Sequence, residues 1–146
     1  MSTEENVTAS AGYSGTPLPR KLGIKPRSTL ALLRAPDSFD AVLGELPDGV
    51  TVVRRLGGAR RDVLVAFFVR EADLRARFDA LREALAWDGG LWIAWPKRAS
   101  GVQTDLDEKV VRELGLAAGL VDNKVCAIDE TWSGLRFVYR VADRPR

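Results

Sequence analysis

The segment Asp62–Val69 (DVLVAFFV) carries an uninterrupted apolar run and constrains the fold most strongly. It is too short to span a bilayer, which needs about 20 apolar residues, and being apolar on both faces is typical of a central parallel strand. Directly after it, Leu74, Phe78, Leu81 and Leu85 recur at intervals of four, three and four residues. That spacing indicates one buried face of an amphipathic helix. The pair predicts a strand followed by a helix, the repeating unit of an α/β sheet.

The same alternation runs along most of the chain. Further strands are predicted over 28–34, 50–53, 91–95, 121–128 and 135–141, and further helices over 39–46 and 105–118. We expect Asp88-Gly-Gly90 to end the helix after Val69, and Thr104 or Asp105 to cap the helix over 105–118. The predicted fold class is α/β: a compact Rossmann-like, mostly parallel sheet of about six strands with helices on both faces and the last strand antiparallel.

The N-terminal region differs in composition from the rest of the chain. Residues 1–11 are small and polar and are expected to be a disordered tail. Residues 12–27 are rich in glycine and proline and predict an extended arm with a short helical turn at 19–22. Residues 28–143 are expected to form a single Rossmann-like domain. The start of the chain lacks the basic and apolar regions of a secretory signal, so a cytoplasmic protein without a membrane segment is expected.

The residue counts exclude several kinds of site. The chain has no histidine and one cysteine, Cys126, which excludes Ser-His-Asp and Cys-His catalysis, an internal disulfide and a CxxC site within this chain. We expect Cys126 to be a small buried hydrophobic residue. The 22 basic and 20 acidic residues nearly cancel, so the whole chain is not expected to attract nucleic acid. We assign no catalytic residue, metal ligand or cofactor from the sequence.

Ligands of open α/β sheets bind at the carboxyl ends of the strands. The loops after Trp95 and Ile128 are expected to be neighbours at that edge. Their candidate ligand-binding or partner-binding residues are Lys97, Arg98, Ser100, Gly101, Asp129, Glu130, Trp132 and Ser133.

This loop pair combines cations with a helix start. Lys97 and Arg98 precede the helix over 105–118, whose free N–H groups favour an anion, and Trp132 offers a flat apolar surface. The alternative is structural: Lys97 pairs with Asp129 or Glu130, and Trp132 packs under the hairpin.

Three stretches carry a resemblance to a known family. They are GYSGTPLPRKLGIKP (12–26), GGLWIAWPK-ASG (89–97 and 99–101) and LVDNKVCAIDETWSGLRFVYR (120–140). Together they resemble an uncharacterised bacterial family, a domain of unknown function, over almost the whole chain from 12 to 143. The resemblance implies no established activity.

The order of elements from Asp62 onward is also similar to the back half of a class I methyltransferase, with a DGG-like turn and an antiparallel final strand pair. The front half departs from that pattern. The turn after the first strand, Arg34–Phe39, has no glycine, and Pro36 lacks an N–H. Arg54-Arg55 stands where the methyltransferases place the acidic residue that binds the cofactor ribose. The resemblance therefore implies the fold and argues against S-adenosylmethionine binding.

Three functions remain open at this point. The first is a non-catalytic Rossmann-like module that binds a protein partner or a small anionic ligand. The second is a divergent transferase-type enzyme without the S-adenosylmethionine loop, using Lys97, Asp129 or Glu130. The third, which the charge balance disfavours, is a nucleic-acid-associated regulator acting through the basic arm, whose cations are Arg20, Lys21, Lys25 and Arg27. A homodimer formed through the arm is a further possibility.

Overall fold

The computed structural model describes residues 15–145. Its six-stranded sheet has the order β3-β2-β4-β5-β7-β6. The strands are β2 (Thr29–Leu33), β3 (Thr51–Val53), β4 (Arg61–Phe67), β5 (Leu85–Pro96), β6 (Leu120–Ala127) and β7 (Trp132–Tyr139). β2 pairs in parallel with β3 and β4, and β4 pairs in parallel with β5. β7 runs antiparallel between β5 and β6. The predicted mostly parallel α/β fold with an antiparallel last strand is confirmed.

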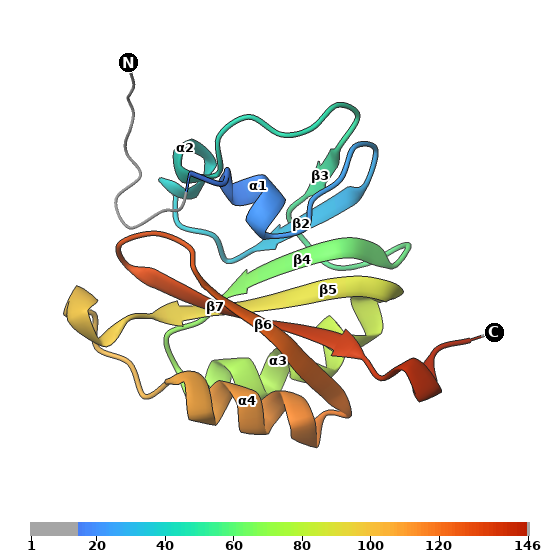
Figure 1. Cartoon of the computed structure of the whole chain (residues 1–146). Helices are drawn as coiled ribbons and strands as arrows, with labels where there is room; N and C mark the ends of the chain where they lie inside the picture. The colour runs from blue at the N-terminus through green and yellow to red at the C-terminus, as the bar shows by residue number, and fades with distance from the viewer. Residues whose placement is uncertain (1–14, 146) are drawn as a thin grey trace, which may run out of the picture.

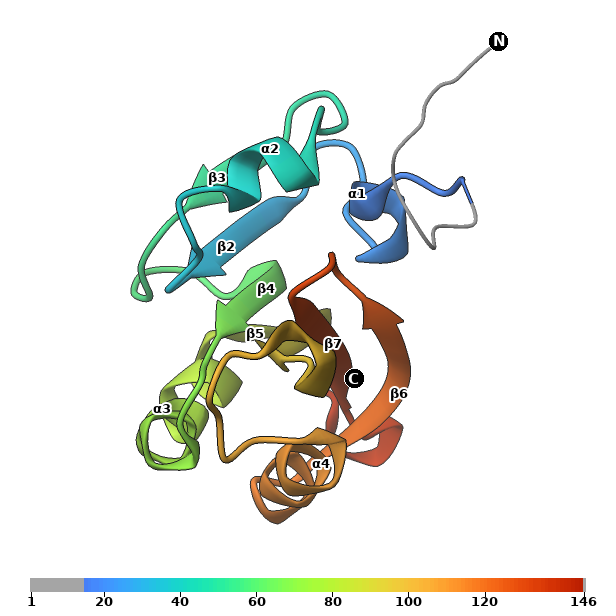
Figure 2. The ribbon, with the colours of Figure 1, turned by 90° about the vertical axis from the view of Figure 1, so that its left-hand side faces the viewer.

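Helices cover both faces of this sheet (Figure 1). α3 (Glu71–Ala84) and α4 (Glu108–Ala117) lie on one face, and the short α1 (Leu18–Lys21) and α2 (Phe39–Leu43) lie on the other (Figure 2). Single 3-10 turns follow β5 at Arg98–Ser100 and β7 at Val141–Asp143. None of the helices in the described part of the chain is long and apolar enough to cross a membrane.

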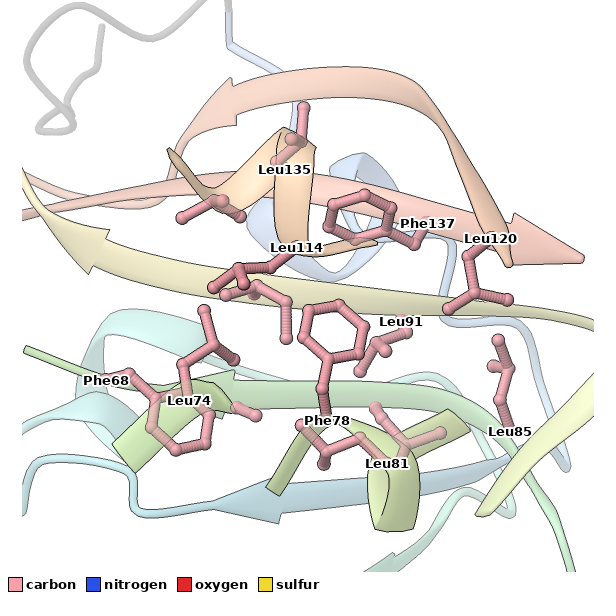
Figure 3. Packing of buried hydrophobic residues seen from close by; sticks show 14 of the residues in the cluster. Phe68, Leu74, Phe78, Leu81, Leu85, Leu91, Leu114, Leu120, Leu135 and Phe137 are labelled. Carbon is pink, nitrogen blue, oxygen red and sulfur yellow. The ribbon is translucent and has the colours of Figure 1, made fainter. Parts of the chain in front are cut away.

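The α3–α4 core fills the space between those two helices and the sheet (Figure 3). Leu74, Phe78 and Leu81 of α3 are buried there, as their spacing predicts. Phe78 packs edge-to-face on Phe137 of β7, with ring centroids 5.7 Å apart.

The α1–α2 core holds the arm against the opposite face. Leu18, Leu22 and Ile24 of the arm are buried together with Trp92 of β5. The indole N–H of Trp92 donates a hydrogen bond to the carbonyl oxygen of Leu22 at 3.0 Å. The arm from Gly15 onward is therefore ordered, with its short helical turn, while residues 1–14, including the expected disordered tail, lie outside the described residues.

The predicted end of α3 at Asp88-Gly-Gly90 is wrong. α3 ends at Ala84, and β5 already begins at Leu85. Both glycines lie inside β5, where the neighbouring chain comes close: a Cβ at Gly89 would lie 2.5 Å from the Asp62 carbonyl oxygen, and one at Gly90 would clash with the Arg136 side chain. Glycine inside a strand commonly marks such a close approach, which the sequence pattern does not distinguish from a helix stop.

Candidate functional site

A cleft of about 1150 Å³ opens at the carboxyl ends of β4 and β5, beside the start of α4. We call it the β5 cleft. Its lining residues are Val69, Arg70, Trp95, Pro96, Lys97, Arg98, Gly101, Val102, Gln103, Thr104, Asp105, Leu106, Asp107, Glu108 and Ser133.

The loop after β5 forms one wall of the β5 cleft and is held by its own hydrogen bonds. The Lys97 N–H donates to the Thr131 carbonyl at 2.7 Å, which ties the loop to the β6–β7 hairpin. The Ser100 hydroxyl donates to the Lys97 carbonyl at 2.6 Å and accepts from the Val102 N–H at 3.1 Å. Gly101 turns the chain with a φ of 78°, a conformation that glycine adopts without strain. The loop thus fixes the backbone from which Lys97 and Arg98 project.

The carboxylates that line the β5 cleft each have a partner. Asp105 accepts a hydrogen bond from the Glu71 N–H at the start of α3 at 2.7 Å. Asp107 caps α4 by accepting from the Val110 N–H at 2.9 Å. Glu108 forms an ion pair within α4. The negative charges of the two aspartates therefore face the positive ends of two helices.

These contacts correct the expected start of α4. The helix begins at Glu108 rather than near Asp105, and Asp107 occupies the helix start that was expected to remain free for an anion. Thr104 is not its cap, because its hydroxyl donates to the Val69 carbonyl at 2.6 Å and accepts from the Leu106 N–H at 3.0 Å.

The cations of the β5 cleft differ from its carboxylates. Within residues 15–145, Arg70, Lys97 and Arg98 form no ion pair, although all three line the same cleft. Arg70 and Arg98 are exposed and Lys97 is half-buried. The three cations are therefore free to bind an anion, whereas the two aspartates are held at the starts of helices and Glu108 is paired within α4.

Four of the residues predicted from the strand-end rule line the β5 cleft: Lys97, Arg98, Gly101 and Ser133. Ser100 lies in the same loop, where its hydroxyl closes the turn. Arg70, Gln103 and Trp95 line the cleft as well. They lie at or after the carboxyl ends of β4 and β5, so the same rule is the signal that identifies them.

The remaining candidates lie elsewhere. One carboxylate oxygen of Asp129 accepts from the N–H groups of Thr131 and Trp132, at 2.8 Å each, and so closes the β6–β7 turn. Trp132 packs edge-to-face on Phe67 in the α1–α2 core, with centroids 5.1 Å apart. Exposed Glu130 is not part of the cleft lining. The expected packing of Trp132 under the hairpin is therefore observed, whereas no ion pair joins Lys97 to Asp129 or Glu130 among the described residues.

Cys126 also differs from expectation. It is half-buried rather than buried, because β6 is an edge strand. Burial raises the pKa of its thiol, an effect opposed by the nearby charges of Lys21, Lys124 and Lys97. The raised pKa keeps the thiol protonated near neutral pH, which disfavours a role as a nucleophile.

The strand order reverses between β2 and β4, and Arg34 lies at that point. In doubly wound folds this switch point is the usual ligand crevice. The Nε–H of Arg34 donates to the Phe67 carbonyl at 3.1 Å, and its guanidinium lies 4.9 Å from the centroid of the Phe68 ring and 3.5 Å from Asp73. The backbone of Arg34 has a φ of 60°, which is rare for a residue other than glycine. The side chain thus spans the carboxyl ends of β2 and β4.

Sequence comparisons assign no family to the chain. No protein-family model matches it, and no curated protein sequence matches it significantly. The resemblance to an uncharacterised bacterial family therefore stays a prediction.

The fold, by contrast, is similar to that of solved S-adenosylmethionine-dependent methyltransferases. A methyltransferase of this kind from Aquifex aeolicus is 14% identical, with a TM-score of 0.59 over 81% of this chain and 85% of that one. The Methanococcus jannaschii fibrillarin pre-rRNA processing protein is 13% identical, with a TM-score of 0.55 over 80% of this chain and 68% of that one. The magnesium protoporphyrin IX methyltransferase from Synechocystis PCC 6803 is 10% identical, with a TM-score of 0.54 over 84% of this chain and 74% of that one.

Coverage of other similar structures is lower. The chain spans 53% of another structure of the Synechocystis enzyme and 39% of LepI. At these identities the likeness establishes the fold alone.

The residues at the switch point do not fit the cofactor of those enzymes. Arg34 lies across the crevice at the end of β2, and Pro36 offers no N–H there. Arg54 follows β3, where an acid would hold the ribose, and it pairs with Asp40 at 3.0 Å. The ribose hydroxyls of the cofactor would meet a guanidinium, which accepts no hydrogen bond, in place of a carboxylate. The fold is therefore methyltransferase-like, and its described switch-point residues Arg34, Pro36 and Arg54 do not fit the cofactor of those enzymes.

Proposed function

We propose that this protein binds a small anionic molecule, bearing phosphate or carboxylate groups, in the β5 cleft of a methyltransferase-like fold. The observation that carries the proposal is the pairing of charges. Arg70, Lys97 and Arg98 have no carboxylate partner in the described chain, whereas Asp105 and Asp107 accept backbone N–H groups at the starts of two helices and Glu108 pairs with Arg112.

The chemistry of the cations favours an oxyanion. Arginine presents a planar fork that binds phosphate or carboxylate through two hydrogen bonds, and lysine adds a compact charge. Trp95 and Pro96 give the same cleft an apolar wall at the end of β5. Because Arg70 and Arg98 are exposed to water, their contribution to binding falls as the salt concentration rises.

A second candidate is a divergent transferase that acts on the same anion. Two observations favour it over a module that only binds. The solved structures that resemble this fold include methyltransferases. Trp132 and the arm pack in the α1–α2 core, so they do not fill the β5 cleft. Lys97 is its acid–base group, because a lysine amine exchanges protons without histidine. Asp129 and Glu130 are not part of this version of the proposal.

The binding proposal is tested by calorimetric titration of the full chain with pyrophosphate at low salt. Lys97→Gln and Arg98→Gln are each expected to weaken binding about threefold to tenfold, the range of a charge-assisted contact that water partly screens. Arg140→Gln is the matched control, because Arg140 is an exposed arginine that follows β7, at the end of the sheet opposite to the β5 cleft. Equal affinities in the wild type and both cleft variants would contradict the proposal.

The transferase candidate needs a separate readout. A metabolite extract is incubated with the wild-type chain and with Lys97→Arg, which keeps the positive charge but replaces the amine with a guanidinium that does not act as an acid–base group. Turnover is expected only with the wild type, and mass spectrometry follows it as loss of an anionic species and gain of a product. If no species changes, this candidate is wrong and anion binding alone remains.

A further inference from the structure

A second cavity lies between α3 and the carboxyl ends of β2 and β4, and it shares no residue with the β5 cleft. Its volume is about 150 Å³, and we call it the arginine notch. It is lined by Leu33, Arg34, Arg54, Arg55, Leu56, Phe68, Arg77 and Leu81.

The arginine notch lies where α3 and α4 leave part of their face of the sheet uncovered. Figure 2 shows α3 and α4 side by side, with β2 and β3 extending beyond them on that face. Leu33 of β2, Phe68 after β4 and Leu81 of α3 are all buried and form an apolar floor. Half-buried Leu56 closes it from the loop after β3. The floor is therefore apolar and preformed.

The rim of the notch carries four guanidinium groups, and only two of them have ionic partners. Arg34 pairs with Asp73, and one nitrogen of Arg54 donates to both carboxylate oxygens of Asp40 at 3.0 and 3.1 Å. The side chains of Arg55 and Arg77 are exposed and form no ion pair or hydrogen bond among the described residues. Clustered like charges repel one another, and a bound anion relieves that repulsion.

We propose that the arginine notch binds an aromatic or short aliphatic carboxylate or phosphate ester. The apolar body lies on Leu33, Leu56 and Leu81, beside the Arg34 guanidinium that covers the Phe68 ring, and the oxyanion lies between Arg55 and Arg77. An apolar cavity of this size accommodates a body as large as benzene. The guanidinium fork binds either oxyanion. The proposal uses none of the β5 cleft residues, so it does not depend on the function proposed for that cleft.

The test is a titration of the full chain, followed by amide chemical shifts, with benzoate and phenyl phosphate as probes. Benzylamine supplies the same ring with the opposite charge, and inorganic phosphate supplies the oxyanion without an apolar body. We expect saturable binding of both aromatic anions with a dissociation constant on the order of 1 mM, as suits ligands of this size. Benzylamine and inorganic phosphate are expected to bind at least about tenfold more weakly, because each lacks one half of the contacts.

Two exposed positions on the rim allow substitutions that leave the floor intact. Arg55→Gln and Arg77→Gln are each expected to weaken benzoate binding about fivefold, and together more than tenfold. Arg75→Gln is the control, because Arg75 lies on the same helix, pairs with Glu71 and does not line the notch. Lys97→Gln in the β5 cleft is likewise expected to change nothing.

Three outcomes would overturn the proposal. They are no saturable binding of either aromatic anion up to roughly twenty times the expected dissociation constant, equal binding of benzylamine, and unchanged affinity in the Arg55→Gln, Arg77→Gln double variant. Benzoate binding that weakens with Lys97→Gln instead would place the anion in the β5 cleft and would also overturn it.

Discussion

Replacing Trp92 with alanine is expected to lower the free energy of unfolding by about 4 kcal/mol, the scale of deleting a large buried aromatic side chain. Trp92 is fully buried in the α1–α2 core, where it packs against the arm. The substitution leaves a cavity and removes the hydrogen bond that the indole N–H donates to Leu22. Both losses act on the contact between the arm and the sheet, so the arm should become accessible to trypsin at Arg20 and Lys21.

Urea denaturation of the full chain measures this change. Trp92→Phe is the matched variant, since it keeps most of the apolar contact and removes only the hydrogen bond and part of the ring. It is expected to lose about 1–2 kcal/mol. If Trp92→Ala does not fold, Trp92→Phe decides the question through its stability and the rate at which trypsin cleaves the arm. A Trp92→Phe variant as stable and as protease-resistant as the wild type would contradict the role assigned to Trp92.

Gly115→Ala is expected to destabilise the protein by about 2 kcal/mol, although alanine inside a helix is normally favoured over glycine by about 1 kcal/mol. A Cβ at Gly115 would lie 2.0 Å from a carbon of the Phe137 ring. That ring is fully buried and packs on Phe78, so it has no free space into which to move. The steric cost therefore exceeds the gain in helix propensity.

Thermal denaturation compares Gly115→Ala with a neighbouring control. Leu116 is the next residue of α4 and is 42% exposed, so Leu116→Ala should change stability by less than about 1 kcal/mol. Combining Gly115→Ala with Phe137→Leu should cost less than the sum of the two single changes, because the smaller side chain removes the clash. A Gly115→Ala variant more stable than the wild type would show that α4 does not pack this closely on β7.

Much of the fold follows from local sequence patterns. The apolar run of β4 and the spacing of Leu74, Phe78 and Leu81 correctly predict a central strand and a buried helix face. The prediction that Asp88-Gly-Gly90 ends α3 fails because Gly89 and Gly90 allow the close approach of Asp62 and Arg136, which are distant in the sequence. A pair of glycines in the sequence therefore does not distinguish the end of a helix from a strand position that another strand approaches closely.

The candidate site shows the same division between local and long-range information. The strand-end rule locates Lys97 and Arg98, since both follow β5 directly. It does not show that Asp129 is used to close a turn or that Trp132 points to the opposite face. Nor does it show that Arg34 lies across the switch point, because its carbonyl partner on Phe67 and its carboxylate partner on Asp73 come from separate elements.

Several expectations from the sequence stay predictions. They are nucleic-acid binding through the cations of the arm, a homodimer formed by the arm, and a cytoplasmic location. A protein partner is likewise untested.

The most direct test records amide chemical shifts of the full chain in parallel titrations with pyrophosphate and S-adenosylmethionine. It asks whether the protein binds an anion in the β5 cleft and does not bind the methyltransferase cofactor. Pyrophosphate should shift the amides of Gly101, Gln103 and Ser133 in the β5 cleft, and these shifts should weaken in Lys97→Gln. S-adenosylmethionine should shift no amide beyond its effect on ionic strength. Saturable shifts caused by S-adenosylmethionine in residues 34–38, or a pyrophosphate titration that leaves the β5 cleft unchanged, would contradict the account.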